Sequence, residues 1–196
     1  MPYDERHSQG TTMTSDTRET MIRCAATLIG TRGVAGASFT DVLAESGAPR
    51  GSIYHYFPDG KRQLTEEAVR WTSDQILGYL ATGPVDSPRA VLAHFVDLWR
   101  RAVVASNGAT GCAVAGVAVD TGTDEPLMTT VRDAFRSWIG ALAQRLRTAG
   151  LDEARSLSVA SLSVAAMEGA LILCRAERNV APLEEVAREL DRLLGP

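Results

Sequence analysis

The polar residues with the clearest chemical potential lie in one short stretch, which runs from Arg50 to His55. It offers a guanidinium, two hydroxyls and an imidazole, on Arg50, Ser52, Tyr54 and His55. These groups suit contacts to phosphates and to the hydrogen-bonding edges of bases. Ile53 interrupts them as the one residue expected to face a core. The residue types therefore indicate a surface that could bind nucleic acid.

Two short helices joined by a tight turn are predicted around this stretch. The first covers about residues 39–46, and the hydroxyl of Thr40 is expected to cap it. Gly47 can supply a left-handed turn, and Pro49 suits the first turn of a second helix over 49–56. The pattern is typical of a helix-turn-helix.

The net charge of −4 is unusual for a nucleic-acid-binding protein, but it is unevenly distributed. Residues 16–62 contain six Lys or Arg and five Asp or Glu, whereas residues 63–196 contain thirteen against seventeen. Binding to a polyanion depends on the few cations that meet phosphates and not on the global charge. Arg50, Lys61 and Arg62 can supply those cations.

Catalytic and metal-binding chemistry has little support. The histidines and cysteines are scattered, without metal-ligand spacing and without a Ser/His/Asp arrangement: His7, His55, His94, Cys24, Cys112 and Cys174. No metal or cofactor is expected, and the chain is not expected to be an enzyme. The chain has no run of 18 or more apolar residues and no cationic start leading to an apolar segment, so a cytoplasmic protein is expected.

Helical periodicity predicts an all-α chain of about nine helices. Residues 1–15 are polar and without period, so a flexible arm is expected there. Residues 16–60 are expected to form a three-helix domain with the helix-turn-helix, and residues 61–196 a larger helical bundle. The stretch AVAGVAVD could be a strand from its valines, but a short helix is preferred because no partner strand is evident. The helix predicted over 152–177 is apolar on more than one face and so needs two partners.

The stretch SIYHYFPDGK and the preceding helix-turn-helix resemble the TetR family of one-component transcriptional repressors. The glycine in PDGK, the GAPRGS turn and the later GCAVAGVAVD segment resemble its LmrA/YxaF-like branch. The resemblance implies a dimeric repressor that binds a palindromic double-stranded DNA operator and releases it when a small molecule binds the second domain. Pro49 stands where many members have a Ser or Thr cap.

Carried over by position, the resemblance implies roles for single residues in DNA binding. Arg50 and Ser52 are the candidates for base edges, and Tyr54 and His55 for phosphates. The remaining three candidates contact the backbone at a helix start or permit its close approach: Thr40, Lys61 and Gly51. Simple steric tolerance is an equal alternative for the glycine.

Large apolar side chains on three predicted helices could form a pocket for a lipophilic or aromatic effector, namely Phe95, Trp99, Met128, Phe135, Trp138 and Met167. Plain core packing is the alternative for each of them. Gly108, Gly111 and Gly116 could leave room for a ligand or permit close helix contact. Glu168 could be a polar anchor, an interface partner or simply exposed.

A homodimer is expected through the last two helices, with Leu162, Leu171 and Leu190 as interface candidates. Two other functions stay open from the sequence. One is a redox-sensing regulator that uses Cys112 or Cys174. The other is a small-molecule-binding or enzymatic helical protein without sequence-specific DNA binding.

Overall fold

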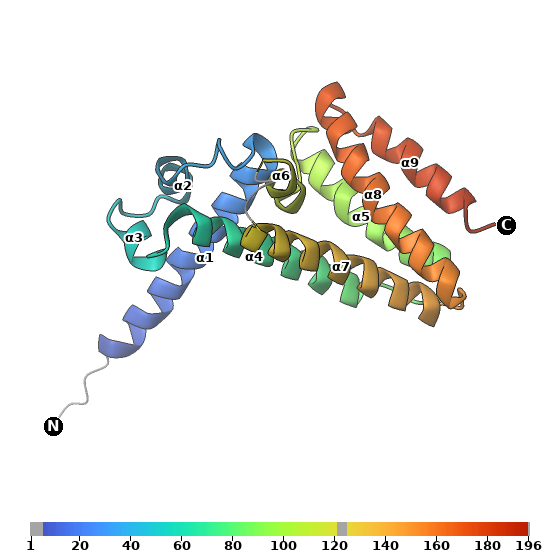
Figure 1. Cartoon of the computed structure of the whole chain (residues 1–196), viewed down its shortest axis with the longest axis horizontal. Helices are drawn as coiled ribbons and strands as arrows, with labels where there is room; N and C mark the ends of the chain where they lie inside the picture. The colour runs from blue at the N-terminus through green and yellow to red at the C-terminus, as the bar shows by residue number, and fades with distance from the viewer. Residues whose placement is uncertain (1–5, 121–124, 196) are drawn as a thin grey trace.

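The computed structural model describes residues 6–120 and 125–195, with side chains from Asp16 onward. The described residues form nine α-helices and no strand, which confirms the all-α prediction (Figure 1). In chain order the helices are α1 Arg6–Arg32, α2 Phe39–Ser46, α3 Ser52–Tyr56, α4 Gly60–Thr82, α5 Pro88–Ala105, α6 Ala113–Asp120, α7 Glu125–Thr148, α8 Glu153–Glu177 and α9 Ala181–Arg192.

The first helix is longer than predicted. It begins at Arg6 rather than near Asp16, so the predicted start of this helix is corrected. The flexible arm over residues 1–15 stays a prediction, and residues 1–5 lie outside the described part of the chain. Extending an existing helix adds one hydrogen bond for each residue fixed, which is why a polar segment without apolar period can still continue it.

The stretch AVAGVAVD forms α6, so the preference for a helix over a strand is confirmed. Its buried side chains, Ala113, Val114 and Val117, pack against α1, α4 and α7. Figure 1 shows α6 at the junction between α1 and the C-terminal bundle.

The N-terminal unit packs α1, α2 and α3 around side chains that include Met21, Val42, Ile53 and Phe57, all of them fully buried. Helix α4 leaves this unit and runs alongside α7 (Figure 1). In the C-terminal unit α7 packs on α8, α8 on α9, and α5 on α7, α8 and α9. The start of α4 therefore belongs to the N-terminal unit and its remainder to the bundle.

Among the described helices, α8 alone is long and apolar enough to cross a membrane by length and composition. Of its most apolar window, 44% is buried inside the protein. The core helix of a globular bundle passes the same test, so the finding is weak evidence for a membrane. What it does show is that α8 has apolar surface on more than one face, as predicted.

Candidate DNA-binding surface and effector domain

Helix α2 is capped by Ser38 and not by Thr40, so the predicted cap is corrected. The Ser38 side chain accepts a hydrogen bond from the Asp41 backbone N–H at 3.2 Å, and the Asp41 carboxylate accepts one from the Ser38 N–H at 3.0 Å. The Ser38 hydroxyl also donates to this carboxylate, and this bond, together with that from the Ser38 N–H, holds the pKa of Asp41 below its usual value. Thr40 lies inside the first turn with an exposed side chain, because the reciprocal capping box places the helix start one residue earlier.

The turn between α2 and α3 begins with Gly47, whose φ of 67° is left-handed and whose N–H donates to the Leu43 carbonyl at 3.0 Å. This confirms the predicted role of the glycine. Helix α3 begins at Ser52 rather than at Pro49, so the second helix is shorter than predicted. The Ser52 backbone N–H and its hydroxyl both donate to the Pro49 carbonyl, at 3.0 and 2.6 Å. Arg50 consequently lies in this turn and not on the helix.

A groove of about 510 Å³ follows the outer side of the two helices. Three of the predicted DNA-binding residues line it, Thr40 and Arg50 at exposed positions and Tyr54 with 69% of its surface exposed. The Tyr54 ring meets the Phe39 ring edge to face, with 5.5 Å between centroids. Ile53 also borders the groove, but its side chain is fully buried and anchors α3 to the core.

The other predicted DNA-binding residues of this stretch differ in exposure and in the hydrogen bonds that they already make. His55 is exposed on α3. The Ser52 hydroxyl is already a donor to the Pro49 carbonyl, so it remains available as an acceptor. A Cβ added to Gly51 would meet no atom within 4 Å. The fold therefore does not require the absence of a side chain at Gly51.

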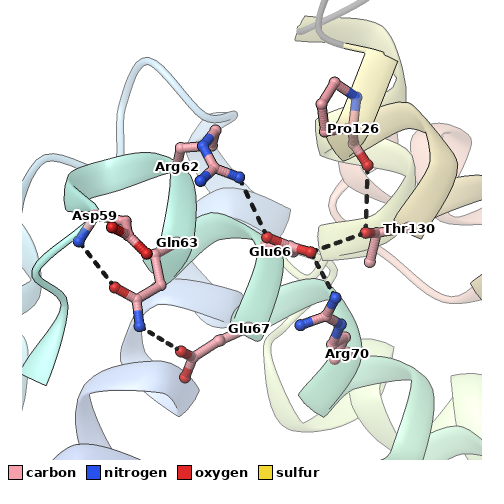
Figure 2. A network of polar contacts seen from close by, with 8 residues as sticks. All are labelled: Asp59, Arg62, Gln63, Glu66, Glu67, Arg70, Pro126 and Thr130. Atoms are coloured by element: carbon pink, nitrogen blue, oxygen red, sulfur yellow. Dashed lines mark hydrogen bonds and ion pairs between the residues drawn. The ribbon is translucent and has the colours of Figure 1, made fainter.

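Lys61 lies in the first turn of α4 and is half-buried, with no salt-bridge partner within the described residues. The cation beside it is engaged, because Nη1 of Arg62 lies 3.5 Å from Oε2 of Glu66 (Figure 2). Arg18 of α1 pairs with Glu67 at 2.5 Å and lies over the Phe57 ring. Of the three cations near the start of α4, Lys61 is thus the one that is available for a phosphate.

Glu66 connects this edge to the C-terminal bundle. Its carboxylate also accepts from Arg70 at 2.5 Å and from the Thr130 hydroxyl of α7 at 3.4 Å (Figure 2). The sequence prediction did not include Glu66 or Thr130. The spacing of Arg62, Glu66 and Arg70 at successive i,i+4 positions could have indicated the ion pairs, whereas the contact to Thr130 depends on the tertiary fold.

Five of the six predicted effector-binding residues lie in the bundle core or pack against it, and Met128 does not. Phe95 and Trp99 of α5 and Phe135 and Trp138 of α7 form a chain of edge-to-face contacts, with centroids 5.2 to 6.4 Å apart. Met167 is fully buried and Met128 is half-buried. None of the six lines any of five cavities found over the described residues. The cluster is filled, so a pocket there stays a prediction.

Two indole nitrogens of this cluster differ in their partners. Nε1 of Trp138 donates to the Ser73 hydroxyl at 3.1 Å. Nε1 of Trp99 is buried and has no hydrogen-bond partner in the described part of the protein. An effector entering this region could accept that hydrogen bond.

Two of the three predicted interface residues are unsuitable for a dimer contact. Leu171 and Leu190 are 2% and 3% exposed because they pack inside the protomer, so assigning them to the interface is corrected. Leu162 is 48% exposed and lines a groove of about 590 Å³ between α8 and α9. The other exposed apolar side chains of α8 are Leu157, Ile172 and Leu173.

Cys112 and Cys174 are both buried. Burial raises the pKa of both thiols, that of Cys112 well above its usual value, with the nearby Glu168 adding to the effect. Protonated, enclosed thiols react slowly with oxidants. These surroundings do not favour the redox-sensing alternative.

A capped helix-turn-helix with an outer groove that carries Thr40, Arg50 and Tyr54, joined by α4 to a larger bundle, defines a DNA-binding transcriptional regulator. Comparison with known proteins gives the family. Residues 22–68 match bacterial regulatory proteins of the tetR family, and residues 88–189 match the C-terminal domain of LmrA/YxaF-like transcriptional regulators. The chain belongs to the TetR family, which is a family of regulators and not of enzymes.

Full-length relatives agree with this assignment. An uncharacterized HTH-type transcriptional regulator of Mycobacterium tuberculosis is 34% identical over 183 residues, which cover 90% of this chain and 93% of that protein. The HTH-type transcriptional regulator LmrA of Bacillus subtilis is 28% identical, with 91% and 97% covered. The crystal structure of a TetR transcriptional regulator from Legionella pneumophila is similar with a TM-score of 0.81 at 25% identity, over 90% of this chain and 96% of that one.

Proposed function

We propose that the protein is a cytoplasmic repressor that binds a palindromic operator as a dimer and releases it when a lipophilic or aromatic small molecule binds. The observation that carries the proposal is the groove lined by Thr40, Arg50 and Tyr54. Arg50 and Tyr54 are exposed there, and neither has an ion-pair or side-chain hydrogen-bond partner within the described residues. Exposed polar groups without partners in the protein suit a partner that supplies phosphates and base edges.

Individual contacts follow from these positions. Arg50 can pair bidentately with a guanine, and its place in the turn lets it reach past the start of α3. The exposed Tyr54 and His55 follow it on α3 and are assigned to the DNA backbone, as is Lys61 on α4. Thr40 contributes its hydroxyl from the first turn of α2, where the partial positive charge of the helix start favours a phosphate.

The dimer is assigned to the α8 and α9 face. Leu157, Leu162 and Leu173 are each about half exposed on α8, and Leu193 follows α9 with 43% exposed. A single copy of the chain leaves this apolar surface in water, and a second copy related by a two-fold axis would bury it on both sides. The two α3 helices would then read half-sites about 34 Å apart.

The effector signal can travel along α4, which contacts both units. The Thr130 hydroxyl of α7 bonds to Glu66, and the same carboxylate holds Arg62 beside Lys61. A small movement of α7 would therefore change the position of the cations at the start of α4. The filled aromatic cluster between α5 and α7 could admit an effector only by such a movement.

The test is a gel-shift assay with the DNA upstream of the protein's own gene, against unrelated DNA of equal length as competitor. Binding that survives the competitor supports the proposal, and equal competition by both DNAs contradicts it. Sedimentation analysis of Leu162→Glu tests the dimer, with Val104→Glu as the matched control. Val104 is 62% exposed but lies on α5. Dissociation by the first variant alone is expected.

A further inference from the structure

A cavity of about 310 Å³ lies where the N-terminal unit meets the bundle. Its walls come from the end of α1, from α6 with the residues before it, and from α8. Ile29, Ala115 and Leu171 supply apolar surface from the three helices. The volume lies within the range typical of small-molecule sites. The aromatic cluster discussed above does not border it.

Glu168 of α8 lines this cavity, and one of its two carboxyl oxygens lacks a partner. Its Oε1 atom is buried and accepts no hydrogen bond from any described residue. The other part of the carboxyl is engaged, because the Cys112 thiol donates a hydrogen bond to it. Leaving a buried acceptor without a donor costs about 1–3 kcal/mol, so a ligand that brings a donor would recover that free energy.

The other charged groups of the cavity are located at its α1 side. Nη1 of Arg175 donates to the Gly30 carbonyl at 3.4 Å, and its Nη2 donates to the Thr31 carbonyl. Oδ2 of Asp120 accepts from the Val34 N–H at 2.5 Å. The last charged group is Arg32, at the end of α1. Arg175 and Asp120 are therefore engaged with the backbone, whereas an oxygen of Glu168 is left free.

We propose that this cavity binds a small apolar amine, whose ammonium group donates to Glu168 while its apolar body packs between Ile29, Ala115 and Leu171. Burial raises the pKa of Glu168 to about 7 when the cavity is empty. A cation beside the carboxyl favours its ionised form, so amine binding and ionisation of Glu168 support each other.

The position of the cavity connects ligand binding to the DNA-binding unit, a consequence that rests on the proposed function. Arg175 follows Glu168 by two helical turns on α8 and holds the last carbonyls of α1. The backbones of Gly30 and Gly111 are also in close contact where α1 meets the segment before α6. A Cβ added to Gly30 would lie 2.5 Å from the Gly111 carbonyl oxygen. A bound molecule would therefore press on the contact that orients α1 against the bundle.

The test uses the full chain without DNA and four matched probes: benzylamine, benzyl alcohol, toluene and benzoate. Calorimetric titration at about pH 8, where Glu168 is ionised, should rank benzylamine tightest by about tenfold or more over the uncharged probes. Benzoate should bind weakest. Equal affinity of the first three probes would overturn the proposal.

Glu168→Gln keeps the shape of the side chain and removes its charge, and should cost benzylamine about tenfold in affinity. Glu177→Gln at the exposed end of α8 is the control and should change nothing. The benzylamine affinity of the unchanged chain should rise between about pH 6 and 8, and the Gln variant should lack that rise. Loss of affinity in both variants, or in neither, would contradict the assignment to Glu168.

Two-dimensional amide spectra locate the probe. Shifts at Ile29, Ala115 and Leu171 are expected, and shifts confined to Trp99 and Trp138 would overturn the site. A chain that binds benzylamine at the cavity but does not bind DNA would refute the proposed function and leave this site intact. A chain that binds DNA but binds none of the four probes would refute this site and leave the proposed function intact.

Discussion

The Thr130 hydroxyl on α7 donates a hydrogen bond to Oε1 of Glu66 on α4, across 3.4 Å. Glu66 also pairs with Arg62, one residue after the candidate phosphate contact Lys61 (Figure 2). The hydroxyl of one bundle residue thus shares a carboxylate with a cation in the first turn of α4. This contact gives α7 a direct way to influence the start of α4.

Replacement of Thr130 by Val should remove this hydrogen bond and keep the shape of the side chain. We expect the free energy of unfolding to fall by about 0.5–1 kcal/mol, measured by urea denaturation. We also expect the effector to release DNA less completely, measured by titration of a preformed complex. Thr129→Val is the control, since the Thr129 hydroxyl bonds only within α7, where it donates to the Glu125 carbonyl and accepts from Arg132. Equal behaviour of the two variants would argue against the α7 to α4 connection.

Ser38 and Thr40 should separate folding from DNA binding. Ser38→Ala removes the N-cap of α2 and should lower the free energy of unfolding by about 1 kcal/mol. Thr40→Ala changes an exposed side chain at the groove and should leave stability unchanged while weakening DNA binding. Thermal denaturation and fluorescence anisotropy, applied to both variants, check the two effects. A loss of stability in Thr40→Ala and not in Ser38→Ala would show that Thr40 is the cap.

Gly111 should not tolerate a side chain. A Cβ added at Gly111 would overlap the carbonyl oxygen and the carbonyl carbon of Gly30. Both are backbone atoms, which cannot move aside as a side chain could. Gly111→Ala should therefore destabilise the protein by more than about 2 kcal/mol. Gly140→Ala is the matched control, since nothing lies within 4 Å and helix propensity should raise stability by up to about 1 kcal/mol. A tolerated Gly111→Ala would mean that α1 and α6 are not in close contact.

The sequence predicted the helices well wherever apolar period and capping signals coincide. The left-handed turn at Gly47 is present as predicted, and the apolar periods of α5 and α8 begin directly after side-chain caps at Ser87 and Asp152. The N-cap of α2 was predicted wrongly because two neighbouring residues can both cap the helix. Both Ser38 and Thr40 can cap, and only the reciprocal bond to Asp41 selects the first.

The site was harder to predict where it depends on packing. Periodicity placed Leu171 and Leu190 on an apolar face but could not distinguish the face toward the protomer core from the outer one. Gly111 could have meant room for a ligand or close helix contact, and the structure shows both, since its added Cβ would overlap the Gly30 carbonyl and the residue also lines the cavity between α1, α6 and α8. The bonds from Arg175 to the end of α1 join residues distant in sequence, and no local pattern indicates them.

Glu168 should make stability depend on pH near neutrality. Burial raises the pKa of its carboxyl from 4.5 to about 7, so the folded chain keeps a proton that the unfolded chain releases. The free energy of unfolding should therefore fall as the pH rises from about 4.5 to about 7 and then level off. Urea denaturation at several pH values checks this. Glu168→Gln should reduce the change in the free energy of unfolding with pH over that range. An unchanged pH dependence in this variant would contradict the raised pKa of the buried Glu168 carboxyl.

The measurement that most directly tests the central claim is the affinity of Arg50→Ala for the upstream DNA, by fluorescence anisotropy at fixed salt. The loss of one bidentate base contact should cost about 1–3 kcal/mol and relax the preference over unrelated DNA. Arg136→Ala is the control, because Arg136 is an exposed arginine of α7, away from the groove. An Arg50→Ala variant that binds and discriminates as well as the Arg136→Ala variant would contradict the assignment of this groove to DNA.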